Sequence, residues 1–271
     1  MNRKTLVHQI FQKRSYLCIG LDPERDKLPP HLLKEKDPVF EFNKQIIDAT
    51  HDICVAYKPN TAFYECDGIA GWQSLEKTKA HIPADIFSIA DAKRGDIGNT
   101  SKMYAKAFFE TLHFDALTIA PYMGSDSVKP FLSYEDKWAI VLGLTSNEGS
   151  SDFQKMTFQN NALYEQVITK VSSWGTPDNI MFVVGATRAE DFSHIRTLIP
   201  NHFLLVPGIG AQGGDLDAVS TNGLIKDAGL LVNSSRGIIY AGKGIDFAKE
   251  ARKEALKINE VMKRHLDILN K

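Results

Sequence analysis

Eight short apolar runs recur along the chain at intervals of about 30 residues, and this rhythm constrains the fold more than any other feature of the sequence. The runs occupy residues 16–22, 53–59, 86–93, 116–122, 138–146, 180–187, 203–210 and 229–237. Their apolar residues are nearly continuous rather than alternating, which is typical of parallel strands covered on both faces. The interval matches one strand followed by one helix. Eight such units predict an α/β fold, a closed (βα)8 or TIM barrel.

The segments between the runs predict helices that cover such a barrel. Residues 38–52, 99–113 and 160–174 carry apolar side chains at spacings of three and four, the period of an amphipathic helix. Residues 245–269 predict a strong closing helix at the C-terminal end of the sequence. The 271 residues contain no proline-rich or serine-rich linker and match the usual size of one barrel. We therefore expect residues 1–271 to form a single domain rather than two smaller ones.

The charge balance and hydropathy of the chain exclude several classes of partner. Lys and Arg number 32 and Asp and Glu number 33, so the formal net charge is -1. This gives no bulk electrostatic reason to bind nucleic acid or an anionic membrane. No stretch approaches the roughly 18 apolar residues of a transmembrane helix. Because the sequence also lacks an apolar signal-peptide core and has only 3 cysteines, we expect a cytoplasmic protein, and any anion that it binds must meet a local site.

Charged residues follow the first three apolar runs, where the active sites of these barrels lie. Asp22 ends the first run and Lys58 lies near the end of the second, while the third runs into Asp91, Lys93 and Asp96. Asp91 and Lys93 are two residues apart, so in a regular strand their side chains project to the same side. An alternating ring of lysines and aspartates keeps all of them charged, which favours a lysine that acts as an acid. The alternative is a solvated ion-pair network at the barrel rim.

Glycine-rich loops follow the seventh and eighth runs. Residues 206–215 contain a GxGxxG pattern, and residues 233–237 read NSSRG. A dinucleotide-binding fold carries that pattern after its first strand instead, so we favour a phosphate site, which these barrels commonly place after strands seven and eight. Arg236 supplies donors that match phosphate oxygens. A purely structural glycine turn is the alternative interpretation.

Other candidate features are weaker. The 8 histidines show no metal-binding spacing, so we expect no metal site. Ser146, which follows the fifth run, either donates a hydrogen bond to a ligand or caps the next helix. Residues 147–160 are rich in Ser, Asn and Gln and form either a lid or a plain surface loop.

Five motifs together resemble one known family. Residues 90–100, ADAKRGDIGNT, match a D-x-K-x-x-D-I-x-x-T signature without departure, and GLDP at 20–23, YKPN at 57–60, PGIGAQGGD at 207–215 and SSRGI at 234–238 support it. The five motifs, in their order along the chain, resemble those of the longer-chain subgroup of the orotidine 5'-phosphate decarboxylases. The resemblance spans nearly the whole chain.

The resemblance implies decarboxylation of orotidine 5'-monophosphate to UMP, the last step of de novo pyrimidine nucleotide synthesis, with no metal or organic cofactor. It implies that Lys93 protonates C6 of the pyrimidine and that Asp91 lies beside the substrate carboxylate. It also implies a homodimer with shared active sites. In such a dimer Asp96 flanks Lys93 across the interface, and Thr100 contacts the ribose of the ligand bound to the other subunit.

The same resemblance implies a set of substrate-binding residues. Lys58 and Asp22 bind the ribose hydroxyls, with Asn60 nearby, and Ser146 contacts the pyrimidine ring. Around the phosphate the set contains Gln212 and Arg236, the backbone of Gly213 and Gly237, and Pro207.

Two other functions remain open at this point. One is a different phosphate-binding barrel enzyme, such as a ribulose-phosphate epimerase or a 3-keto-6-phosphogluconate decarboxylase; the latter shares a similar signature but normally uses a metal. The pairing of KRGDI with GAQGGD favours the nucleotide decarboxylase. The other is a catalytically silent nucleotide-binding protein. The presence of all four charges of the ring, Lys58, Asp91, Lys93 and Asp96, argues against it.

Overall fold

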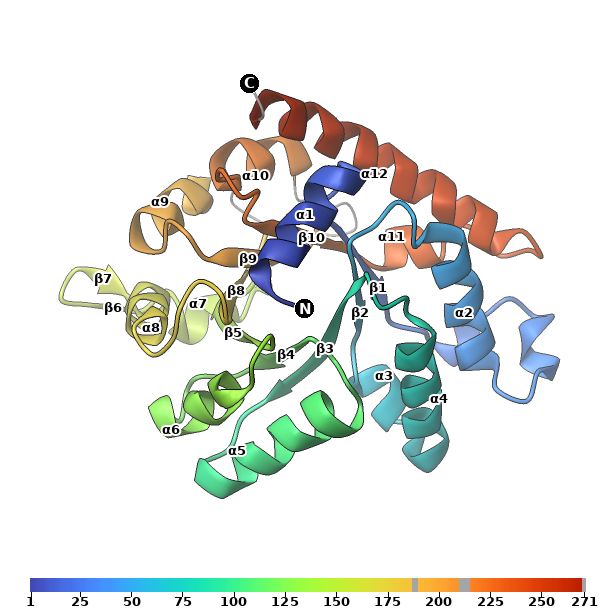
Figure 1. Ribbon diagram of the computed structural model, residues 1–271, viewed down its shortest axis with the longest axis horizontal. Coiled ribbons are helices and arrows are strands. Elements are labelled where there is room, and N and C mark those ends of the chain that lie inside the picture. Colours follow the sequence, from blue (N-terminus) through green and yellow to red (C-terminus); the bar gives the residue numbers. More distant parts are fainter. Residues whose placement is uncertain (187–189, 210–214, 270–271) are drawn as a thin grey trace.

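Eight parallel strands close into a barrel in the computed structural model, which describes residues 1–186, 190–209 and 215–269. Around the barrel the strands follow the order β1-β10-β9-β8-β5-β4-β3-β2, so neighbours in the sheet are successive barrel strands of the sequence (Figure 1). Their bounds are β1 Leu17–Leu21, β2 Ala56–Pro59, β3 Phe87–Arg94, β4 Ala116–Ile119, β5 Trp138–Leu144, β8 Ile180–Val184, β9 Phe203–Pro207 and β10 Leu230–Ser234. The predicted (βα)8 fold is confirmed.

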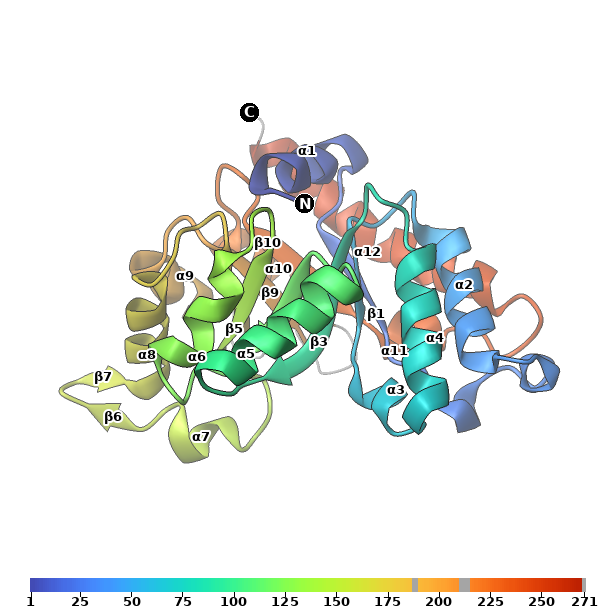
Figure 2. The same ribbon diagram turned by 60° about the horizontal axis from the view of Figure 1, so that its bottom comes forward.

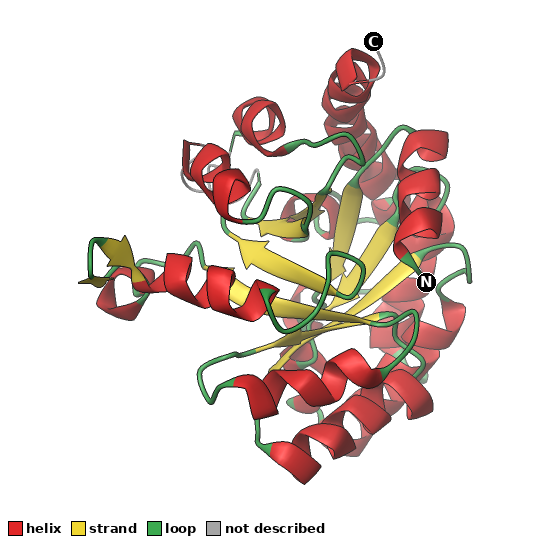
Figure 3. Cartoon of the chain, turned by 60° about the vertical axis from the view of Figure 1, so that its left-hand side comes forward, coloured by secondary structure: helices red, strands yellow, loops and turns green. Residues whose placement is uncertain are grey.

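The continuous apolar character of the strands follows from their position between two packed layers. All residues of β1, β2, β4, β8 and β10 are buried. Side chains on one face fill the interior of the barrel, and those on the other pack under the surrounding helices, which Figure 3 shows outside the strands. Six of the eight predicted runs continue for one to three residues beyond their strands, into the loops that carry polar groups, while the runs of β2 and β3 end at or just before the ends of those strands.

The helices alternate with the strands around the barrel. Their bounds are α1 Arg3–Lys13, α2 Pro38–Thr50, α3 Ala62–Glu65, α4 Gly68–His81, α5 Gly98–Ala105, α6 Ser125–Val128, α7 Ser150–Phe153, α8 Leu163–Ser172, α9 Glu190–Leu198, α10 Leu216–Gly223, α11 Arg236–Ile239 and α12 Phe247–Leu269. A π-helical segment, Lys106–Thr111, continues α5. The closing helix α12 buries Ala251, Ala255, Asn259 and Met262, a spacing of three and four that turns one face to the barrel.

Helix α1 covers the end of the barrel where the strands begin. Trp138, the first residue of β5, donates from Nε1 to the carbonyl oxygen of Met1 at 2.8 Å, and the Arg3 guanidinium lies 5.0 Å from the ring centre of Phe203, the first residue of β9. In Figure 2 α1 lies at the upper end, and α3, α7 and α11 lie at the lower end, where the strands finish. The barrel is therefore covered at its N-terminal end and presents its loops at the other.

The insert predicted at residues 147–160 forms local structure of its own. It contains α7 and leads into a hairpin of β6 Thr157–Phe158 and β7 Asn161–Ala162, which projects sideways from the barrel (Figures 1 and 3). Among the described helices, none is both long and apolar enough to cross a membrane.

Candidate active site

The C-terminal ends of the strands surround a cavity of about 560 Å³. Of the site residues predicted from the sequence, the structure brings the following together around it: Asp22, Lys58, Asn60, Asp91, Lys93, Ser146, Pro207 and Arg236. These residues come from the ends of β1, β2, β3, β5, β9 and β10 or from the loops that follow them. Distant segments of the sequence therefore meet in one polar hollow, as expected for this fold.

An ion-paired triad lies at the centre of this cavity. Asp91 accepts hydrogen bonds from both lysines: Lys58 Nζ lies 2.7 Å from Oδ2 and Lys93 Nζ lies 2.6 Å from Oδ1. The Lys58 side chain is 5% exposed and that of Asp91 is 10% exposed, whereas half of the Lys93 side chain is exposed. Lys93 is thus the member of the triad whose amine is open to a ligand.

The surroundings keep the buried members of the triad charged. Burial alone raises the pKa of Asp91, but the positive charges of Lys58 and Lys93 outweigh it and hold that pKa well below its ordinary value. Burial lowers the pKa of Lys58, but the carboxylates of Asp91 and Asp22 outweigh it and raise that pKa above its ordinary value. The charged states that the sequence predicted for these two residues agree with these directions.

The backbone at the end of β3 is irregular. The register between β3 and β4 shifts between Ala90 and Arg94, and Lys93 has a φ of +47°, in the left-handed region. From their spacing in the sequence, Asp91 and Lys93 were expected to meet through the regular alternation of a strand. They do meet, but through this irregularity, because a regular strand has no residue with positive φ.

Asp22 and Asn60 are linked beside the triad. The backbone N–H of Asn60 donates to Asp22 Oδ1 at 3.2 Å, and the Asn60 side chain accepts from the backbone N–H of Ala62 at 3.1 Å. Tyr240 donates from its hydroxyl to the carbonyl oxygen of Asp22 at 3.0 Å. The loops after β1 and β2 are therefore fixed to each other and to the end of α11.

Asp96 does not join the ion-paired triad within one chain, whereas the resemblance places it beside Lys93 of a second subunit. The strand ends at Arg94, and the following loop carries Asp96 away from the cavity. There its Oδ1 accepts from the backbone N–H of Ile97 at 2.7 Å, and its carbonyl oxygen accepts from Ser101. No ion pair involves Asp96 in the described part of the chain. The ring consists of Lys58, Asp91 and Lys93, with Asp22 beside it.

Two further predicted residues, Thr100 and Gly237, do not line the described cavity. Thr100 lies exposed on α5, and Gly237 lies on α11 next to Arg236. Gln212 and Gly213 lie outside the described residues.

The cavity also contains polar residues that the sequence analysis missed. Gln154 donates from Nε2 to Thr145 Oγ1 and accepts from the Thr145 backbone N–H, both at 2.8 Å, and Thr145 Oγ1 donates to Asn147 at 2.6 Å. Asn233 donates to Ser235 Oγ at 3.2 Å near Arg236. Only the polar composition of residues 147–160 signalled the first group, and the NSSRG motif signalled the second.

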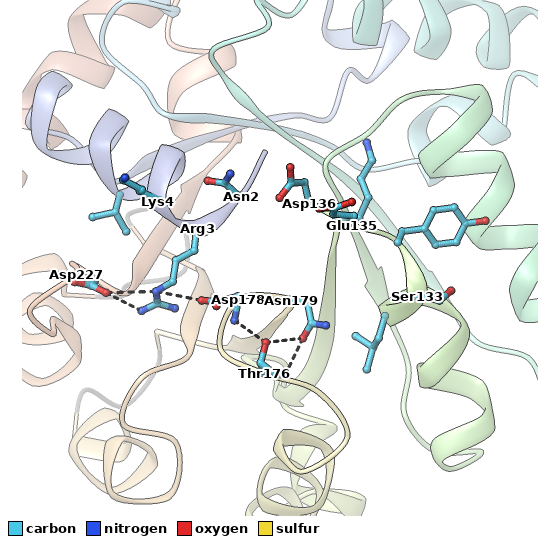
Figure 4. A pocket seen from close by; sticks show the side chains of 14 residues that line it. Asn2, Arg3, Lys4, Ser133, Glu135, Asp136, Thr176, Asp178, Asn179 and Asp227 are labelled. Carbon is cyan, nitrogen blue, oxygen red and sulfur yellow. Dashed lines mark hydrogen bonds and ion pairs between the residues drawn. The ribbon is translucent and has the colours of Figure 1, made fainter.

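A second cavity, of about 760 Å³, lies at the opposite end of the barrel beside α1 (Figure 4). Its guanidinium, Arg3, is already bound: it lies 3.3 Å from Asp227 and 3.9 Å from Asp178, and it donates to the carbonyl oxygen of Pro177 at 2.8 Å. The charge of Arg3 is thus compensated by two carboxylates of its own chain. The converging, partly exposed ammonium of Lys93 distinguishes the C-terminal cavity as the candidate active site.

Comparison with known proteins identifies the family of the chain. The profile of the family described as "Orotidine 5'-phosphate decarboxylase / HUMPS family" matches residues 15–253. The chain belongs to this family. The resemblance inferred from the five motifs is therefore confirmed.

Close relatives of this family member cover nearly its whole length. A protein of Flavobacterium johnsoniae named orotidine 5'-phosphate decarboxylase is 59% identical over 98% of this chain and 99% of its own, and one of Phocaeicola vulgatus with the same name is 56% identical over 97% and 98%. The structure of Leishmania donovani OMP decarboxylase is 38% identical with a TM-score of 0.83, over 97% of this chain and 99% of that chain. That of Leishmania donovani UMP synthase is 40% identical with a TM-score of 0.83, and this chain spans only 56% of its length.

Among the described residues, no group of three or more His, Cys, Asp or Glu side chains has an arrangement that holds a metal ion.

Proposed function

We propose that this chain decarboxylates orotidine 5'-monophosphate to UMP and carbon dioxide, the last step of de novo pyrimidine nucleotide synthesis, without a metal or organic cofactor. One observation carries the proposal: in the Lys58–Asp91–Lys93 triad, the half-exposed Lys93 lines the cavity at the C-terminal end of the barrel. Membership of the decarboxylase family supports it.

In this reaction the bond between C6 and the carboxylate breaks, and its electron pair stays on C6 of the pyrimidine. The Lys93 ammonium stabilises that charge as it develops and then transfers a proton from Nζ to C6. Such a preoriented charge acts more strongly in a cavity with little water than in bulk solvent. Asp91 lies beside the departing carboxylate and forms ion pairs with both Lys93 and Lys58, which orients the Lys93 ammonium.

The remaining cavity residues bind the substrate around the reacting carbon. Asp22 and Lys58, with Asn60 nearby, bind the ribose hydroxyls, and Ser146 contacts the pyrimidine. Arg236 binds the phosphate with Gln212, beside Pro207 and the backbone of Gly213 and Gly237. Arg236 supports this assignment because it borders the cavity from the loop after β10, a usual phosphate position in these barrels.

The working unit in this proposal is a cytoplasmic homodimer in which residues 1–271 form one domain per subunit. Asp96 and Thr100 then complete the neighbouring active site, which accounts for their position away from the cavity of their own chain. The exposed apolar side chains of Ile97, Met103 and Met123 lie on the same part of the chain and suit contact with a second copy.

Replacement of Lys93 tests the proposal directly. We expect Lys93→Ala to bind the nucleotide tightly but to lose nearly all turnover, because the proton donor and the stabilising charge are both removed. The measurement is the loss of ultraviolet absorbance of orotidine 5'-monophosphate, with UMP binding followed by calorimetry. Lys249→Ala, on the exposed surface of α12, is the matched control and should turn over normally.

The same assay separates the competing functions. A metal-dependent decarboxylase of the superfamily would lose its activity in a chelator, and a silent nucleotide-binding protein would bind UMP without any turnover. No turnover by the wild-type chain, a strict metal requirement, or near-normal rates for Lys93→Ala would each contradict the proposal.

A further inference from the structure

The irregular end of β3 faces a single residue of β4. Ala90 pairs with Leu117 and Arg94 pairs with Ile119, so three residues of β3 lie between these pairs while Thr118 alone lies between them on β4. A regular parallel ladder cannot supply one partner to each of three residues. The three include both Asp91 and Lys93, so the polar groups of this segment need other partners.

The hydroxyl of Thr118 supplies two of those contacts. It accepts a hydrogen bond from the backbone N–H of Lys93 at 2.9 Å and donates one to Asp91 Oδ1 at 3.0 Å. The same Oδ1 accepts from Lys93 Nζ at 2.6 Å. The backbone and the side chain of Lys93 are thus joined into a closed ring of hydrogen bonds through Thr118 and Asp91.

This ring stabilises a conformation that is otherwise unfavourable. A lysine with positive φ is sterically disfavoured and persists only where its surroundings hold it. Thr118 is fully buried behind the two charged side chains and does not belong to the described lining of the cavity. Its hydrogen bonds among the described residues connect it to the cavity through Asp91 and Lys93.

We propose that Thr118 is a positioning residue for the decarboxylation, a role that rests on the function proposed above. Its hydroxyl fixes the left-handed backbone of Lys93 and one oxygen of Asp91, and so determines where the ammonium lies relative to the reacting carbon. A displacement of about 1 Å in such a group costs up to about 100-fold in rate.

The nearly isosteric Thr118→Val removes the hydroxyl and keeps the shape of the side chain. We expect kcat to fall about 10- to 100-fold with KM changed less than about threefold, because positioning of the proton donor is lost while the substrate contacts remain. Thr118→Ser, which retains the hydroxyl, should stay within about threefold of the wild-type kcat. The amide hydrogen of Lys93, which loses its acceptor, should exchange with solvent faster in Thr118→Val than in Thr118→Ser.

Thr50→Val is the matched control for the loss of a buried threonine hydroxyl. Thr50 is also fully buried; its hydroxyl lies 2.6 Å from the carbonyl oxygen of Ile46 and 2.6 Å from the Tyr57 hydroxyl, on the outer side of β2. The Thr50→Val substitution should lower the free energy of unfolding and leave kcat near normal. If Thr118→Val does not fold, Thr118→Ala compared with Thr118→Ser carries the test, since the Ala variant should be the slower of the two.

The outcomes separate this proposal from the function on which it rests. A wild-type chain that does not decarboxylate the nucleotide overturns the function, while the exchange of the Lys93 amide still tests the hydrogen-bond ring. Normal kcat and unchanged exchange in Thr118→Val overturn the positioning role alone. Equal loss of kcat in the Val and Ser variants also overturns it, because the hydroxyl would then not be the group that matters.

Discussion

Asp91 and His202 are buried titratable side chains with opposite surroundings. Asp91 lies between two lysines and accepts three hydrogen bonds, so its charge is compensated. His202, 7% exposed, lies against the ring of Phe182, and neither ring nitrogen has a hydrogen-bond partner among the described residues. Burial, together with the positive charges of Arg3 and Arg196, lowers the pKa of His202 to about 4. The first side chain is stable when charged, and the second only when neutral.

His202 therefore makes the stability of the fold depend on pH. The pKa of His202 is lower in the folded state than in the unfolded chain, where a histidine has a pKa of about 6.5. Between these values the unfolded chain binds a proton that the folded chain excludes, so the free energy of unfolding falls as the pH drops from about 6.5 towards 4, by about 2 to 3 kcal/mol from this group. Above about pH 6.5 this loss is absent.

His202→Leu should remove this component, because leucine is uncharged at every pH. We expect urea unfolding, at one fixed protein concentration, to give a shallower loss of stability between pH 6.5 and 4.5 for His202→Leu than for the wild type. His8→Leu, on the exposed surface of α1, is the control and should follow the wild type. An unchanged pH slope in His202→Leu would rule out the assignment to this residue.

The ends of β5 and β8 approach closely beside the cavity. The backbone N–H of Gly185 donates to the carbonyl oxygen of Leu144 at 2.8 Å, and a methyl group added at Gly185 would lie 2.7 Å from the backbone nitrogen of Ser146. Such a distance requires the backbone to move. The absence of a side chain at Gly185 thus sets the position of the loop that carries Ser146.

Gly185→Ala should displace that loop while the barrel stays folded. We expect kcat/KM to fall at least about tenfold, since Ser146 moves relative to the substrate, and stability to fall by about 1 to 3 kcal/mol from overpacking. Gly143→Ala is the control, because its methyl group would lie 3.0 Å from the Ile168 side chain of α8 and 3.1 Å from the carbonyl oxygen of Val183, and not against the backbone of Ser146. Assays should show reduced activity only in Gly185→Ala; equal activities in the two variants would contradict the argument.

The strands and the charged residues of the cavity were predictable because they depend on local sequence and on general rules of barrels. Runs of continuous apolar residues identified all eight strands, and the rule that chemistry lies at their C-terminal ends selected Asp22, Lys58, Asp91 and Lys93. These inferences need no knowledge of exact register.

The irregular end of β3 could not be predicted, because it depends on the exact register between β3 and β4. Thr118 lies inside a buried β-branched run, where threonine is an ordinary strand residue, and only the register shift opposite Asp91 gives its hydroxyl a special role. The contacts of Gln154 with Thr145 depend likewise on how the loop after β5 turns. The outward turn of Asp96 follows from where β3 ends, which the DAKRGD motif alone does not specify.

At the scale of the molecule, the near-zero net charge conceals a strongly uneven distribution. The formal charge of -1 is the sum over a chain that places three cations, Lys58, Lys93 and Arg236, and the two carboxylates of Asp22 and Asp91 around one cavity. A cavity with these cations suits an anionic substrate that carries both a carboxylate and a phosphate. In the proposed homodimer, Asp96 of a second chain adds the next negative charge beside Lys93.

A mixed dimer tests whether active sites are shared. We expect Lys93→Ala and Asp96→Ala each to be nearly inactive as homodimers. When the two variants are co-expressed with different tags and the mixed dimer is purified, one of its sites combines an intact Lys93 with an intact Asp96 from the neighbour, so about half of the wild-type activity should return. The control pairs Lys93→Ala with the double variant Lys93→Ala/Asp96→Ala, which leaves no site with Lys93 and should stay inactive. If Asp96 acted within its own chain, the first mixed dimer would be as inactive as the second.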